Sequence, residues 1–510
     1  SVCLALYIAF WLELDEPYWT ATSALIACLP QMGASLRRGW YRVLGTLLGV
    51  AMSLLVAALF PQDRIAFLLV LALWGAASAF ATTILRNFAA YGAALSGYTV
   101  AVIAGGSLGA SGGVHAELVF PLAMARASEI VIGIVCTGIV RTLTDTGNAP
   151  QRLATLIAGL SAEIARGFGT TLAPAPAGAR DMTPLRRALL KRVIALDPVI
   201  DQALGESSWL RYHAAALQRA LDGLFCALVG WRAVERHLAS LAPDQARDRA
   251  CTVLRCLAPD RNLRVGLADP ARWLADPKGL RRTCDAAMQR LADLQADTAS
   301  LRLLADKTAE LLAGISHALG GLALLVEPGR PKRVRGTTSL RVPDLLPALV
   351  NAGRAFATIG AAALLWVATG WPNGVTALTF AMVIVIAQGP QAAGAYANSL
   401  AFSVGAAGAS MVAIIVTFAV LPALPTHFAA LSLVLGLCLV PLAALTMLVA
   451  HPGRATLLGT MMTLIVPFLA PTNPMRFDGA AHLNQMLAIL AGCMLGAASF
   501  RLIPPPAPRL

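Results

Sequence analysis

The stretch VLGTLLGVAMSLLVAALF, residues 43–60, decides the class of fold. It contains no charged residue and no proline, and an apolar run of about 18 residues or more is typical of a transmembrane helix. Similar stretches lie on both sides of it, and together they predict an all-α integral membrane protein with twelve transmembrane helices. The predicted helices are residues 1–13, 18–36, 43–60, 65–84, 88–105, 118–142, 352–370, 374–389, 398–421, 428–450, 455–471 and 484–503.

The composition of the 510 residues agrees with this class. Hydrophobic residues make up 57% and charged residues 13%, whereas soluble domains average about 45–50% and about 25%. A single soluble globule is therefore excluded. Residues 144–342 hold 28 of the 40 Lys and Arg and 19 of the 27 Asp and Glu, leaving 12 and 8 elsewhere. The net charge of +13 is thus spread between a charged middle section and loops, and we expect no nucleic-acid partner.

The charges in the short loops predict the orientation. Basic residues fall in the second and fourth loops, at Arg37, Arg38, Arg42 and Arg86. Because Lys and Arg accumulate on the cytoplasmic side, the N-terminus and the middle section are predicted to be cytoplasmic. Three domains follow: a first six-helix half over 1–143, a cytoplasmic helical bundle over 144–342, and a second six-helix half over 343–510.

The middle section has apolar residues at helical spacing, for example over 209–240 and 283–326, with breakers at Pro243 and Pro270. We expect a bundle of four or five helices. The sequence contains no phosphate-binding loop, dinucleotide fingerprint or nucleophile elbow. Its nine cysteines and seven histidines have no metal-ligand spacing. We therefore expect that the protein is not an enzyme and that it has no cofactor and no metal site.

The two halves resemble each other. Residues 17–20 (PYWT) match 371–374 (WPNG), Gln31 beside Pro30 matches Gln388 near Pro390, and Gly45 matches Gly405. Six helices separate the copies, which predicts a parallel repeat about an axis along the membrane normal, as in transporters. The alternative is that apolar helical sequences look alike by chance.

Several motifs carry a resemblance to a known family. They are PYWTATSALIACLPQ (17–31), RGWYRVLGTLLGV (38–50), AAYGAALSGYTVAVIA (89–104), ARASEIVIGIV (125–135), GWPNGVTALTFAMV (370–383) and NPMRFDGAAHLNQMLAILAGCMLG (473–496). In this order they resemble the fusaric acid resistance family, also called the aromatic acid exporter family.

The resemblance implies a bacterial inner-membrane exporter of aromatic carboxylic acids, driven by the proton gradient and working with a periplasmic membrane-fusion protein. A homodimer also fits such a fold. Many family members carry a second cytoplasmic domain after the last helix. Since the numbering starts without Met, we expect some N-terminal residues to precede it, and the second cytoplasmic domain is either absent or not included in this sequence.

Arg126 and Glu129, inside the sixth predicted helix, are the first candidate site. Ionisable residues in a membrane helix cost at least about 2.5–3.5 kcal/mol and mark a pathway or a partner. Their spacing of three places them on one helical face. Arg126 could bind a substrate carboxylate and Glu129 the coupling proton. The alternative is a permanent ion pair that locks the bundle.

The second candidate site follows from helix breaks at matching places in the two halves. Short or interrupted helices in corresponding positions indicate a transporter's substrate site. Hydroxyl, amide and ring groups near the breaks are the substrate-binding candidates: Tyr98, Thr99, Gln31, Gln388 and Asn473. The neighbouring glycines are explained as well by close helix packing, as at Gly492 and Gly496.

The acidic loop after the first helix could feed protons inward through Asp15 and Glu16, although a solvated loop explains these residues too. The resulting hypothesis is a proton-coupled exporter of small aromatic carboxylates, with alternating access between the two halves. A passive organic-anion channel is the first alternative, because a basic intramembrane residue and a cytoplasmic helical domain also resemble the plant aluminium-activated malate channels. A non-transporting membrane scaffold is the second.

Overall fold

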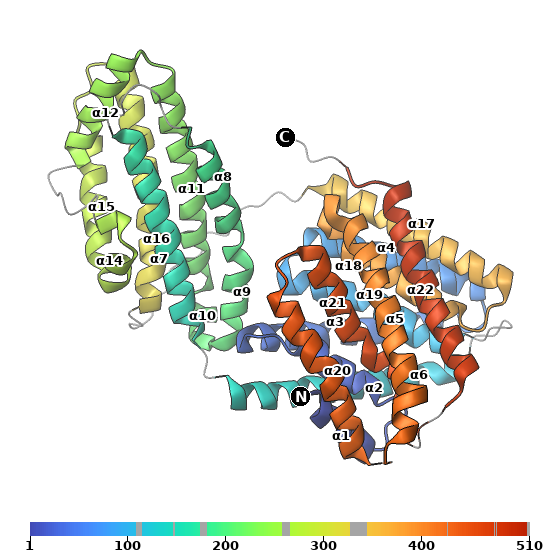
Figure 1. Ribbon diagram of the computed structural model, residues 1–510. Coiled ribbons are helices and arrows are strands. Elements are labelled where there is room, and N and C mark those ends of the chain that lie inside the picture. Colours follow the sequence, from blue (N-terminus) through green and yellow to red (C-terminus); the bar gives the residue numbers. More distant parts are fainter. Residues whose placement is uncertain are drawn as a thin grey trace. The chain divides into compact units, whose positions relative to one another are not determined.

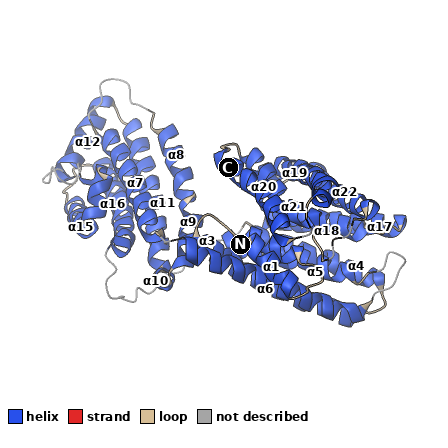
Figure 2. Cartoon of the chain, turned by 60° about the horizontal axis from the view of Figure 1, so that its bottom comes forward, coloured by secondary structure: helices blue, strands red, loops and turns tan. Residues whose placement is uncertain are grey.

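The computed structural model describes residues 1–108, 115–145, 148–173, 181–257, 266–326, 344–425, 427–473, 475 and 477–506. These described residues form helices and no β-strand (Figure 2). The chain divides into two compact units (Figure 1). One joins Ser1–Asp145 to Arg341–Leu510, and the other is Thr146–Leu340.

The first unit contains two helical segments. The first segment consists of α1 (Val2–Trp11), α2 (Tyr18–Ala27), α3 (Met32–Leu59), α4 (Arg64–Ile84), α5 (Asn87–Gly106) and α6 (Ala116–Thr144). The second consists of α17 (Leu345–Thr369), α18 (Gly374–Gln388), η1 (Gly389–Gly394), α19 (Ala395–Ile415), η2 (Val416–Val420), η3 (Leu421–Ala423), α20 (Phe428–Leu448), α21 (Pro452–Leu469) and α22 (Gly479–Leu502).

Among the described residues, nine helical stretches are long and apolar enough to cross a bilayer. Eight of them belong to the first unit, and one of those eight runs from Gly374 to Ala423 through the break η1. This unit is therefore embedded in a lipid bilayer. The ninth stretch is α16 (Ala299–Val326) of the other unit, whose apolar face is buried inside that unit.

The start of α3 corrects the predicted helix bounds. The chain is not helical from Cys28 to Gln31, and the helix resumes at Met32, so the predicted loop at 37–42 is wrong. Pro30 lacks a backbone donor and disfavours helix at the residue before it. Ser35 Oγ closes the turn, accepting from Leu29 N at 2.8 Å and donating to Leu29 O at 3.0 Å. Arg42 consequently lies inside α3.

The two segments use the same helix pairs for packing. In the first, α3 packs on α5 and α2 on α6; in the second, α19 packs on α21 and α18 on α22. Each pair meets at a glycine that faces a carbonyl oxygen, where a Cβ would collide. These contacts are Gly45 on Gly92, Gly405 on Leu457, Gly133 on Thr20, and Gly492 on Ala377. Gly492 and Gly496 therefore serve close helix packing, as small residues do in membrane interfaces.

The second unit is a helical bundle. Its helices are α7 (Ala149–Leu172), α8 (Thr183–Ile194), α9 (Leu196–Glu206), α10 (Ser208–Tyr212), α11 (Ala214–Ala239), α12 (Pro243–Leu257), α14 (Pro270–Ala275), α15 (Pro277–Ala292) and α16. Within the described ranges, five of these have 15 residues or more, and the prediction missed the four short ones. Pro243 and Pro270 each open a helix, where their missing N–H costs nothing. Trp231 is fully buried in the core and donates from Nε1 to Thr171 Oγ1 at 2.8 Å.

Candidate functional site

Arg126 on α6 is held between two carboxylates. Its Nη1 donates to Glu129 Oε2 at 2.9 Å. Its Nη2 donates to Oε2 of Glu16, a residue of the loop before α2. Arg126 is 9% exposed and Glu129 is 1% exposed, whereas the side chain of Glu16 is 40% exposed. The guanidinium thus ties the middle of α6 to the loop between α1 and α2.

Trp19 completes this group, which we call the Arg126 cluster: Glu16, Trp19, Arg126 and Glu129. The Arg126 guanidinium lies 4.7 Å from the centre of the Trp19 ring, a cation–π distance. Trp19 Nε1 also donates to Glu16 Oε2 at 3.1 Å. Trp19 therefore has two specific partners, the Arg126 guanidinium and the Glu16 carboxylate. One arginine compensates one carboxylate, so the ionised cluster carries a net negative charge that a proton would neutralise.

The other predicted site residues lie in different surroundings. Thr99 on α5 packs against Gly49 of α3 and is buried in that helix contact. Tyr98 is half-buried and lies near enough to Arg42 for electrostatic interaction. Asn473 is exposed beyond α21, and Asp15 is exposed beside Glu16. Among the described contacts, only Glu16 and Glu129 of the predicted residues touch Arg126.

Gln31 and Gln388 lie at the helix breaks of the two segments. Gln31 precedes the first residue of α3, and its carbonyl accepts from Ser35 N at 3.0 Å. Gln388 ends α18, and its Oε1 accepts from Gln391 Nε2 at 2.6 Å. The break after Gln388 contains Ala392 with φ at 47°, a left-handed conformation that costs a non-glycine residue about 1–3 kcal/mol.

Two buried arginines were not predicted as site residues. Arg354 on α17 is 1% exposed, donates from Nε to Ile503 O at 2.8 Å, and donates from Nη1 to Asn351 Oδ1. Arg42 on α3 is 3% exposed and donates to Tyr91 and Ser23. Arg42 was assigned to a loop because the predicted helix started too late, at residue 43, and Arg354 fell at the start of the predicted helix 352–370. Arg38 and Arg42 are four residues apart and lie among aromatic residues. This spacing is the signal that could have indicated Arg42 as a site residue.

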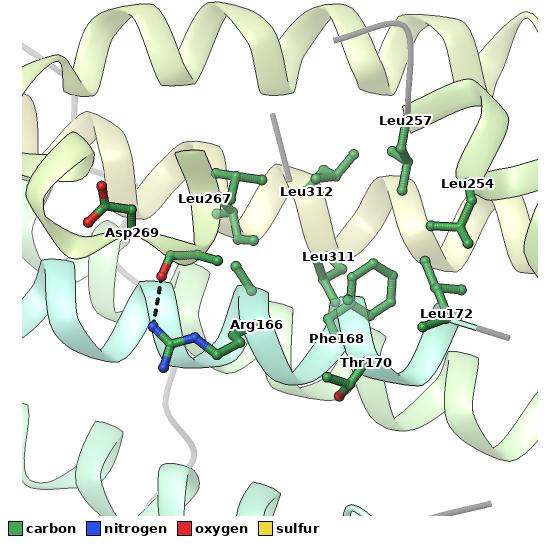
Figure 3. Close-up of a pocket in the computed structure, with 15 residues that line it drawn as sticks. Arg166, Phe168, Thr170, Leu172, Leu254, Leu257, Leu267, Asp269, Leu311 and Leu312 are labelled. Carbon is green, nitrogen blue, oxygen red and sulfur yellow. Dashed lines mark hydrogen bonds between the residues drawn. The ribbon is translucent and has the colours of Figure 1, made fainter. Parts of the chain in front are cut away.

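The bundle unit contains an apolar cavity of about 620 Å³ (Figure 3). Arg166 and Asp269 lie at one end of it, and Phe168, Leu172, Leu254 and Leu257 line the rest. Arg166 Nη2 donates to Ala268 O at 2.8 Å, so its charge already has an acceptor. None of the predicted site residues lies here. Within the described ranges, no group of three His, Cys, Asp or Glu side chains could hold a metal ion.

Apolar helices long enough to cross a bilayer, with an arginine and the Glu129 carboxylate buried among them, are features of a multi-pass membrane transporter. The comparison with known sequences specifies it further. The chain belongs to the fusaric acid resistance protein family, whose profile matches residues 1–510. The family predicted from the motifs is thereby confirmed.

Named relatives cover nearly the whole chain. It is 26% identical over 525 residues to the "Uncharacterized transporter YdhK" of Escherichia coli (strain K12), covering 99% of this chain and 72% of that protein. It is 27% identical over 528 residues to the "p-hydroxybenzoic acid efflux pump subunit AaeB" of Edwardsiella ictaluri (strain 93-146), covering 96% and 73%. Family and relatives together support a membrane efflux transporter, and their names indicate transporters rather than enzymes.

Proposed function

We propose that this protein exports small aromatic carboxylates across the bacterial inner membrane in exchange for protons. The observation that carries the proposal is Arg126, buried in α6 between Glu16 and Glu129 and against the Trp19 ring. The name of the AaeB relative, a p-hydroxybenzoic acid efflux pump subunit, supports the choice of substrate class. Arginine suits this substrate because its guanidinium binds carboxylates with two parallel hydrogen bonds.

In this proposal the Arg126 cluster is a proton-operated gate. With both carboxylates ionised, Arg126 holds the loop before α2 against α6. Protonation of Glu16 or Glu129 removes the charge that binds it, and the freed guanidinium then meets the carboxylate of the departing substrate. Protons reach the cluster from the periplasm past Asp15 and Glu16. They leave to the cytoplasm when the ion pairs form again, so that a proton moves inward for substrate moving outward.

The transport cycle is proposed to be alternating access between two six-helix halves, with twelve transmembrane helices in all. The identical helix pairs of the two segments, with glycines facing carbonyl oxygens at equivalent places, support a duplicated architecture. Tyr98 would face the substrate's aromatic ring, and Gln31 and Gln388 would allow the helix breaks to move. We place the N-terminus and the bundle unit in the cytoplasm. A periplasmic membrane-fusion protein and a second copy of the chain are proposed partners.

Efflux from reconstituted vesicles tests the proposal. Vesicles loaded with 4-hydroxybenzoate should export it faster when the exit side is acidic, and a proton uncoupler should remove the acceleration. In Glu129→Gln the amide mimics the protonated acid, so export should continue and depend less on the pH gradient, because Glu16 is then the one carboxylate of the cluster left to take up a proton. Efflux by the unaltered protein that ignores the uncoupler would refute proton exchange. Steady single-channel currents in a bilayer would identify a passive channel instead.

A further inference from the structure

The inference concerns Arg42, which lies inside α3 without a carboxylate partner. Its Nη1 donates to the Tyr91 hydroxyl at 2.7 Å, and its Nη2 donates to Ser23 Oγ at 3.1 Å. The side chain is 3% exposed, and Arg42 Nε has no hydrogen-bond partner. No carboxylate pairs with it among the described residues. Arg42 lies about 15 Å along the helix axis from Met32, at 1.5 Å per residue.

The other buried arginines of this unit have acceptors that carry negative charge. Arg126 has two carboxylates. Arg354 has the carbonyl oxygen of Ile503, the C-cap residue directly after α22, where the helix dipole places partial negative charge. A buried charge is costly without such compensation. Arg42 has only two neutral hydroxyls, so its surroundings favour the arrival of an anion.

The hydroxyls around Arg42 have unused donor capacity. Tyr91 and Ser23 each accept from Arg42 with a lone pair, and neither donates its own proton to an acceptor in the described contacts. Thr20 and Thr46, one helical turn from Ser23 and Arg42, are buried with Oγ1 unpartnered. Helical hydroxyls elsewhere usually donate to the carbonyl four residues back, as Thr22 does to Tyr18 O at 2.6 Å.

Arg38 adds a second positive charge at the same place. Its guanidinium lies 4.9 Å from the centre of the Tyr91 ring. Spacing of four along α3 places Arg38 and Arg42 on one face, where like charges repel each other. An anion between the two arginines and the hydroxyls would relieve the repulsion and satisfy the unused donors.

Arg42 and Arg126 make their contacts at different positions along α2 and the loop before it. Arg126 contacts Glu16, just before α2, while Ser23, which contacts Arg42, lies opposite Gly133 of α6. Gly133 is seven residues from Arg126, or about 10 Å along the helix. A carboxylate leaving Arg42 would therefore find the next guanidinium about two helical turns away.

We propose that Arg42, with Tyr91 and Ser23, binds the carboxylate of the transported aromatic acid before the acid reaches Arg126. The inference rests on the proposed function and deepens it by naming the loading site. Tyr98, which lies within electrostatic range of Arg42, is the aromatic residue proposed to pack against the ring of the substrate. The ligand class is a monocarboxylate attached to an aromatic ring.

Calorimetric titration of the purified full chain with benzoate tests this site. Arg42→Gln should weaken benzoate binding about tenfold or more, since a hydrogen-bonded charge pair is lost. Tyr91→Phe, which removes one O–H donor, should weaken it less. Arg86→Gln is the matched control: Arg86 is exposed, the substitution removes the same charge, and binding should be unchanged. Benzamide, the neutral analogue, should not bind to the unaltered protein.

The outcomes separate the inference from the proposed function. Benzoate binding and 4-hydroxybenzoate export that survive Arg42→Gln would overturn the loading site and leave the exporter standing. An unaltered protein that neither binds nor exports either acid would overturn both. If Arg42→Gln does not accumulate, Arg42→Lys and Tyr91→Phe take its place, since each keeps the charge. Unchanged benzoate affinity in both would overturn the inference.

Discussion

The two helical segments of the membrane unit have the same packing and different chemistry. Gly133 on α6 meets Thr20 O on α2, and Gly492 on α22 meets Ala377 O on α18 in the same way. Seven residues before Gly133 stands Arg126, whereas seven residues before Gly492 stands Gln485. Four residues before them stand Glu129 and Ala488. At these positions the second segment has the same glycine contact, which we call the frame, without the charges.

The same difference holds around Arg42. It stands three residues before Gly45, whose counterpart in the helix contact is Gly405, and three residues before Gly405 stands Phe402. A helix pair of this geometry therefore forms with a phenylalanine in place of the arginine. The comparison teaches that the glycines build the frame, while the buried charges are additions that packing does not require. Replacing each kind of residue tests that separation.

Substitution of a packing glycine should reduce the amount of folded protein more than substitution of a buried charged residue. In Gly492→Val the new Cβ would collide with the Ala377 carbonyl oxygen, and α18 and α22 could not pack as they do. Overpacking of this kind costs about 1–3 kcal/mol or more. We expect little folded protein in the membrane fraction, measured by fluorescence-detected size exclusion. Gly436→Val is the control, because a Cβ there meets nothing within 4 Å. Equal accumulation of both variants would contradict the role of the frame.

Arg126→Gln gives α6 the residue that α22 has at the equivalent place. We expect normal accumulation, because Glu129 can take up a proton and so avoid remaining as an isolated buried charge. Export of 4-hydroxybenzoate should fall about a hundredfold or more, since a charge-assisted bond to the carboxylate is lost. Vesicle efflux and membrane-fraction blotting measure the two effects. Loss of the protein itself would show that Arg126 and Glu129 are a structural ion pair.

The sequence predicted the frame better than the site. Apolar length indicated the eight membrane-crossing stretches found among the described residues of the first unit, and the motif order identified the family, because both depend on many residues at once. The spacing of Arg126 and Glu129 placed them on one helical face, where the structure pairs them. Their second carboxylate, Glu16, is 110 residues away in sequence, and local spacing cannot show such a pairing.

Arg42 was missed because its local pattern has a second explanation. Arg42 was assigned to a loop because charge clusters near helix ends are the usual sign of topology. Its burial depends on α3 beginning at Met32, directly after the turn at Pro30. Thr99 was predicted as a binding residue from its hydroxyl alone. Its packing against Gly49, in the contact between α3 and α5, is a feature that local spacing cannot show.

Ser23→Asp would give Arg42 a carboxylate partner, as Arg126 has. The new carboxylate should accept from Arg42 Nη2, where the Ser23 hydroxyl now does at 3.1 Å. We expect benzoate binding to weaken about tenfold, since the internal anion competes for the guanidinium. Ser23→Asn, similar in size and uncharged, should retain most of the affinity. Titration calorimetry measures both, and equal loss in the two variants would show that crowding rather than charge is responsible.

Trp19→Phe should have the smallest effect. Phenylalanine keeps a ring near Arg126, where the Trp19 ring centre now lies 4.7 Å away, but loses the indole N–H that donates to Glu16 at 3.1 Å. A neutral donor to a carboxylate contributes about 1.5–3 kcal/mol, and the half-exposed position of Glu16 lets water replace part of it. Glu16 would then ionise less readily, so the gate should open at a higher pH. The pH at which efflux reaches half its maximum should rise slightly, with the maximal rate nearly unchanged. A fall in that maximal rate as large as in Arg126→Gln would mean that Trp19 contacts the substrate directly.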